Sequence, residues 1–83
     1  MKLKLGNLGD LIDTDSGEKV RFVATPVHGA GWTVSRVVGS SRTGLASTLV
    51  GGYSIHYTMH QAQIAADMLT RDTKRAVVDH QEG

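Results

Sequence analysis

Residues 51–71 read GGYSIHYTMHQAQIAADMLTR, and within them a strand-like alternation gives way to a helical repeat. Thr58-Met59-His60-Gln61 has the form of a capping box, in which Thr58 accepts from the Gln61 amide and the Gln61 side chain reaches back. Apolar side chains then recur at three- and four-residue spacing. The stripe consists of Gln61, Ile64, Ala65, Met68 and Leu69. This pattern predicts an amphipathic helix over residues 59–71.

The residues before this helix alternate between apolar and polar side chains, as strands do. Glycine-rich turns separate the segments. The expected strands are residues 2–5, a short approach at 11–12, then 18–27, 32–38, 45–50 and 53–57. For residues 45–49 a single helical turn is the alternative. Pro26 cannot donate to a sheet ladder, so the far end of its strand should lie at an edge or a bulge.

The expected fold is therefore α+β, an antiparallel β-meander of three to five strands with one amphipathic helix packed on one face. Of the helix, Ile64, Ala65, Met68 and Leu69 should face the sheet residues Val20, Phe22, Trp32 and Val34. Trp32 is expected to be the chief core residue. Residues 72–78 either extend the helix or form a short strand, and residues 79–83 are expected to form a loose tail.

Length and composition favour a single domain over residues 1–83. The apolar share is 40 %, but it consists mainly of Val, Ala and Leu, so a homodimer or a partner covering one face is a reasonable expectation. The chain has no cysteine, which excludes disulfides and thiolate zinc sites. It also lacks a signal-peptide pattern and an apolar run of about 18 residues. A cytoplasmic protein without membrane association is expected.

Two loops match ligand-binding motifs only in part. Asp13–Glu18 opens like a calcium loop, but the fifth, sixth and twelfth positions lack the required oxygen ligand, glycine and glutamate. A hairpin turn is the better interpretation. Gly39–Gly44 has the glycine spacing of a phosphate-binding loop, but the lysine and hydroxyl residue that should follow are absent. Arg42 in this loop remains a candidate for holding a backbone phosphate or a partner's carboxylate.

The histidines do not form a recognisable catalytic or metal motif. His56 and His60 are four residues apart, but the capping Thr58 between them should leave His56 extended and His60 in the first helical turn. Ser54 near His56 lacks a nucleophile elbow and an orienting acid. We therefore expect no enzymatic activity, no catalytic residues, no metal and no cofactor.

Charge gives two functional hypotheses. Nine Lys and Arg nearly balance eight Asp and Glu, and the cations are scattered, whereas nucleic-acid binders usually gather a basic surplus on one face. Binding to a protein or nucleoprotein complex is the first hypothesis. A small nucleic-acid-binding protein that uses the sheet face and scattered arginines is the alternative. The candidate partner-binding residues are Arg21, Arg36, Arg42, Tyr53 and Tyr57.

Three segments give the chain a resemblance to a known group of proteins. They are residues 32–38, 44–52 and 58–69, a glycine-rich meander followed by a capped, alanine-rich helix. In size and element order this resembles the small accessory proteins of bacteriophages and mobile elements, among them some anti-CRISPR proteins. The resemblance implies a phage-encoded inhibitor that acts in the host cytoplasm by occupying a surface on a defence complex such as CRISPR-Cas. It assigns no functional residue.

Overall fold

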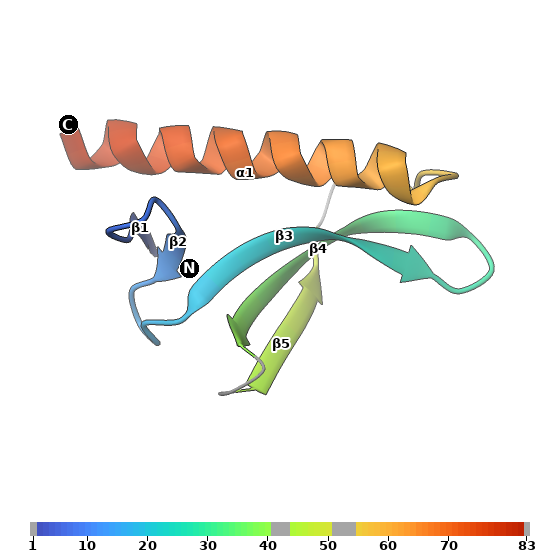
Figure 1. Cartoon of the computed structure of the whole chain (residues 1–83), viewed down its shortest axis with the longest axis horizontal. Helices are drawn as coiled ribbons and strands as arrows, with labels where there is room; N and C mark the ends of the chain where they lie inside the picture. The colour runs from blue at the N-terminus through green and yellow to red at the C-terminus, as the bar shows by residue number, and fades with distance from the viewer. Residues whose placement is uncertain (1, 41–43, 51–54, 83) are drawn as a thin grey trace.

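A computed structural model describes residues 2–40, 44–50 and 55–82 of the chain. Within them, five strands precede one long helix, which lies across the sheet (Figure 1). The elements are β1 Leu3–Leu5, β2 Leu11–Asp13, β3 Lys19–Val27, β4 Gly31–Ser40, β5 Gly44–Leu49 and α1 Met59–Glu82. The α+β prediction, with an antiparallel sheet and one helix on one face, is confirmed.

The strands form one antiparallel sheet whose spatial order is the chain order, β1-β2-β3-β4-β5. The long β3–β4 hairpin forms the centre of this sheet, and its residues pair from Val20↔Val38 to Val27↔Gly31. β2 pairs with β3 only at Val20 and Lys19, so no described strand lies beside the rest of β3 on that side. Pro26 therefore lies where no donor is needed, as expected. Residues 44–49 form a strand rather than a helical turn.

The turn after β2 is built around the Asp13 carboxylate. It accepts from the Asp15 amide at 3.2 Å and the Ser16 hydroxyl at 2.9 Å, and the Asp13 carbonyl accepts from the Gly17 amide at 2.8 Å. Gly17 has a positive φ of 75°, which side-chain-bearing residues rarely adopt. The hairpin interpretation of this segment is confirmed.

The start of the helix agrees with the sequence analysis and its end does not. The Gln61 amide donates to the Thr58 hydroxyl at 3.2 Å, so Thr58 is the N-cap. The reciprocal bond from the Gln61 side chain is absent among the described residues. α1 continues well past residue 71 to Glu82, so residues 72–78 are helical and residues 79–82 are not a loose tail. The reason is local, because no glycine or proline interrupts residues 72–82.

The face that α1 turns to the sheet differs from the expected one. Ile64 and Met68, expected in the core, are 47 % and 50 % exposed, whereas Ala62 and Ala66 are fully buried. Ala65 and Leu69 are half-buried at the border. Alanine is small, so the helix backbone can approach the strands closely. The side of α1 that carries small residues therefore packs on the sheet, and the side that carries the larger apolar residues faces solvent. The expected packing of Ile64 and Met68 on the sheet is wrong.

The core lies between α1 and the face of the sheet that carries Val20 and Val34. Leu11, Val20 and Val77 form its central cluster, and half-buried residues pack against it. Those residues are Leu3, Leu5, Phe22 and Val38. Val20 and Val34 occupy the positions expected from the alternation, but Trp32 is only half-buried and is not the chief core residue.

The chain approaches α1 by crossing the end of the β3–β4 hairpin. Trp32 and His56 exchange backbone hydrogen bonds of 2.8 and 2.7 Å. Gly31 makes this crossing possible, because a Cβ at that position would collide with the His56 carbonyl. The expected strand 53–57 is reduced to this one bridge in the described part, while residues 53–54 lie outside the described residues.

Candidate macromolecule-binding surface

Large exposed apolar side chains gather around the start of α1. Of the six found among the described residues, five fall within residues 55–68, and the sixth is Leu8. The five are Ile55, Tyr57, Met59, Ile64 and Met68. Single exposed apolar residues are ordinary on protein surfaces, whereas a concentration of them often marks an interaction site.

Within this group, Ile64 and Met68 share one side of α1. They are one helical turn apart and therefore lie on the same side of α1, opposite the buried Ala62 and Ala66. Farther along, Arg71 and Arg75 continue this solvent-facing side, and both are exposed. We call these four residues the outer face of α1. Met and Arg are enriched in protein–protein interfaces, so this combination fits a protein contact.

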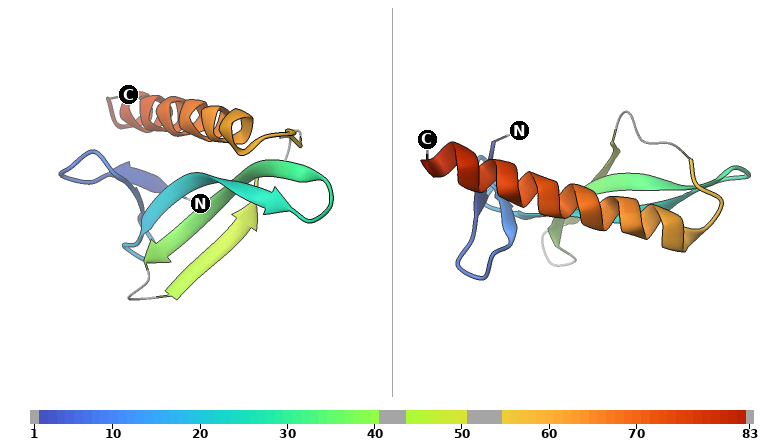
Figure 2. Two further views of the ribbon diagram at one scale, coloured as in Figure 1. Left: turned by 45° about the vertical axis from the view of Figure 1, so that its right-hand side comes forward. Right: turned by 90° about the horizontal axis from the view of Figure 1, so that it is seen from above.

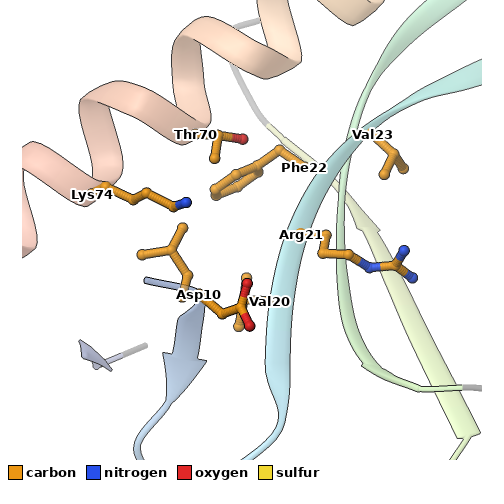
Figure 3. A pocket seen from close by; sticks show the side chains of 8 residues that line it. Asp10, Val20, Arg21, Phe22, Val23, Thr70 and Lys74 are labelled. Carbon is orange, nitrogen blue, oxygen red and sulfur yellow. The ribbon is translucent and has the colours of Figure 1, made fainter. Parts of the chain in front are cut away.

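The two described arginines among the expected binding residues lie on opposite faces of the sheet. Arg21 pairs with Val37 of β4, whereas Arg36 pairs with Phe22 of β3 and Thr48 of β5. Arg36 therefore shares a sheet face with Phe22, and Arg21 lies on the other face. Figure 3 shows the Arg21 side chain pointing away from α1, while the Phe22 ring points toward it. One ligand on a single sheet face therefore cannot contact both arginines.

Arg36 is a packed residue rather than an open rim residue. It lies on the helix-facing side of β4, is half-buried, and its Nε is buried without a hydrogen-bond partner among the described residues. Any test that removes Arg36 therefore disturbs packing as well as charge.

The remaining expected binding residues divide into one described and two undescribed positions. Tyr57 is 92 % exposed immediately before the helix, among the apolar residues around its start. Arg42 and Tyr53 lie outside the described residues, as does the middle of the Gly39–Gly44 loop. The binding surface expected from the sequence thus stays a prediction. Among the described residues, Tyr57 is the one that belongs both to this expected surface and to the exposed apolar residues around the start of α1.

A recess separates α1 from the edge of β3 (Figure 3). Phe22, Thr70 and Lys74 line it, and the Lys74 ammonium points into it. Across the recess, Asp10 pairs with Lys19 at 3.3 Å. Its volume of about 230 Å³ lies below the ~300–1,000 Å³ of typical small-molecule sites. This recess does not compete with the outer face of α1 as a candidate site.

His56 and His60 do not share a helical face. His56 sits in the isolated bridge to Trp32, and His60 lies in the first turn of α1, as expected from the position of Thr58. Among the described residues, no three His, Asp or Glu side chains come together in a way that could hold a metal ion. In the same part of the chain, no helix is both long enough and apolar enough to cross a bilayer.

The sequence predicted Tyr57 as a binding residue and did not predict the outer face of α1 as a candidate surface. It assigned Ile64 and Met68 to the core because they are the largest apolar residues of the helical stripe. The signal that could have corrected this is the spacing of the small residues, since Ala62, Ala66 and Val77 recur on one side over the full length of α1.

Comparisons with known proteins add no assignment. A scan against protein-family models, a search of curated proteins and a search of solved structures each found no match.

Proposed function

We propose that this protein is a non-enzymatic binding protein that occupies a surface on a protein partner, with the outer face of α1 and Tyr57 as the contact. The observation that carries the proposal is the concentration of exposed Ile55, Tyr57, Met59, Ile64 and Met68 in one short segment. Their exposure costs hydration free energy that a partner would recover by covering them, at about 25 cal/mol per Å² of apolar area.

The kind of partner follows from chemistry and from resemblance. An apolar centre of Ile64 and Met68 with Arg71 and Arg75 beside it suits a protein surface that has an apolar patch and a neighbouring acidic one. The resemblance to small phage-encoded inhibitors favours a host defence complex, such as a CRISPR-Cas effector, as the owner of that surface.

Nucleic-acid binding is the alternative from the sequence, and the positions of the arginines do not favour it. Arg21 and Arg36 lie on opposite faces of the sheet, so they do not line one path. A phosphate-tracking surface needs several cations along one path. The protein contact is therefore the function that the geometry supports best.

The proposal is tested by photo-crosslinking in bacterial cells. A photoreactive phenylalanine analogue replaces Ile64 in one variant and Thr48, an exposed residue of β5, in a matched control. We expect a discrete adduct from position 64 and none of the same mass from position 48. The partner, identified by mass spectrometry and purified, should form a complex of fixed stoichiometry by native mass spectrometry.

The double variant Ile64→Glu/Met68→Glu should then weaken binding of the purified partner about a hundredfold, because two charges would be buried at the contact. Circular dichroism and melting should stay close to the parent, since both positions are exposed. Adducts only between copies of this chain would replace the proposal with a homodimer. Equal adducts from positions 64 and 48 would contradict it.

A salt titration separates the nucleic-acid alternative. Fluorescence anisotropy with random-sequence DNA and RNA should show no saturable binding at about 0.15 M salt. Tight binding that falls steeply with salt would indicate phosphate contacts and would overturn the protein-contact proposal.

A further inference from the structure

The last turns of α1 extend past the edge of the sheet. Ala62 and His80 lie on the same side of the helix, about five turns apart, yet Ala62 is fully buried and His80 is exposed. Ala76, near His80, is exposed as well. Figures 1 and 2 show the reason, because the C-terminal end of α1 passes over the β1–β2 hairpin and beyond it, where none of the described strands lies beneath.

A groove of about 610 Å³ lies at this place. Its floor and walls come from the start of the chain and from the last turns of α1. The lining residues are Lys2, Leu3, Lys4, Thr14, Thr73, Ala76, Val77 and His80. Lys2 and Lys4 point to one face of β1 and Leu3 to the other. The groove touches both faces of β1 and therefore reaches the open edge of this strand, while Thr14 lines it from the β2 side.

The backbone at this edge is oriented for pairing with another strand. The Thr14 amide donates to the Lys2 carbonyl at 3.0 Å, so the peptide groups of Lys2 point toward β2. Neighbouring residues of a strand present these groups to opposite sides, and those of Leu3 therefore point into the groove. β1 is the end strand of the sheet, and no described strand pairs with this side.

The charges of the groove select its occupant. Lys2 and Lys4 are exposed, and neither has an ion-pair partner among the described side chains. Asp13 of β2 pairs with Leu3, so its carboxylate lies on the other face from the lysines, and it accepts from Ser16 in its own turn. On the other face, Ala76 and Val77 offer apolar contact.

We propose that this groove binds an extended acidic peptide segment of another protein, which adds as a strand to the open edge of β1. Its acidic side chains would alternate with small apolar ones, the acids meeting Lys2 and Lys4 and the apolar residues lying under α1. A second copy of β1 fits poorly, because lysines would face lysines across the pair.

This inference goes beyond the proposed function, since it uses a different side of α1 and can fail or succeed independently of it. The test uses the whole chain and a fluorescein-labelled hexapeptide of alternating Glu and Val. We expect saturable anisotropy binding and, in hydrogen-exchange NMR, new protection of the Leu3 and Leu5 amides. A peptide of alternating Lys and Val should not bind. An N-methylated Glu-Val peptide, which lacks backbone donors, should bind much more weakly.

Two variants and one control test whether the peptide binds in this groove. Lys2→Glu/Lys4→Glu should weaken peptide binding about tenfold or more, whereas Arg71→Glu/Arg75→Glu, with the same charge change on the outer face of α1, should change it less than about twofold. Ala76→Trp fills the groove while leaving both lysines, and it should also abolish binding.

Several results would overturn the proposal. They are equal loss in both double variants, unchanged Leu3 exchange at saturating peptide, and undiminished binding of the N-methylated peptide. Displacement of the peptide by an oligonucleotide that protects the same amides would assign the groove to nucleic acid. A dimer in sedimentation that already protects Leu3 without peptide would assign it to a second copy.

Discussion

Arg21 and Arg36 lie at adjacent positions of the β3–β4 pairing but on opposite faces of the sheet, and their exposure to solvent differs accordingly. Arg21 is exposed on the face away from α1, and Arg36 is half-buried on the face toward it with a buried Nε. A buried nitrogen without a hydrogen-bond partner lowers stability, and other contacts of the fold must offset that loss. From the alternation alone both residues qualify as binding residues, because the sequence does not show which face the helix covers.

The two arginines give a matched test of this difference. Arg36→Glu should lower the free energy of unfolding by about 1–3 kcal/mol, because a shorter anionic side chain brings charge next to buried neighbours. Arg21→Glu, with the same change of charge, should lower it by less than about 0.5 kcal/mol. Urea denaturation measures both. Equal losses would show that Arg36 is as well solvated as Arg21.

At the scale of the element, the helix was predictable in existence and start but not in length or rotation. Thr58 marks the start through its side chain, which is local chemistry and readable from the sequence. The rotation depends on which stripe the sheet can accommodate, which is a tertiary property. Small Ala62 and Ala66 satisfy it, and the larger Ile64 and Met68 are left outside.

The rotation can be tested with one substitution at two positions of α1. Ala66→Leu should lower the free energy of unfolding by about 1–3 kcal/mol, because no room exists between the helix and the strands. Ala76→Leu, at an exposed position of the same helix, should change it by less than about 0.5 kcal/mol. A larger loss at position 76 than at 66 would contradict the observed packing. Thermal and urea unfolding report the comparison.

At the scale of the whole molecule, the strand order could be predicted because the turns are local. Asp13–Gly17 and His28–Gly31 each reverse the chain with their own residues, so consecutive strands must pair. The contacts that close the fold are long-range. Two of these contacts join distant segments, namely the packing of Val77 against Leu11 and the close approach of Gly31 to His56. No periodicity in the sequence predicts either contact. The groove at β1 was missed for the same reason.

The Gly31 crossing can be isolated by comparison with a nearby glycine. Gly29 and Gly31 both have positive φ, but a Cβ at Gly29 would meet nothing, whereas one at Gly31 would strike the His56 carbonyl. Gly31→Ala should therefore lower the free energy of unfolding by about 1–3 kcal/mol more than Gly29→Ala. Equal effects in thermal unfolding would show that the His56 segment moves aside without cost.

The position of Val77 in the core also has a consequence for synthesis of the protein. Leu11 and Val20 leave the ribosome well before Val77, which completes their cluster. At ~5–20 residues per second, the interval between Val20 and Val77 is roughly three to eleven seconds. During that time the nascent sheet lacks the last turns of α1, so the cluster of Leu11 and Val20 closes only after Val77 has been made.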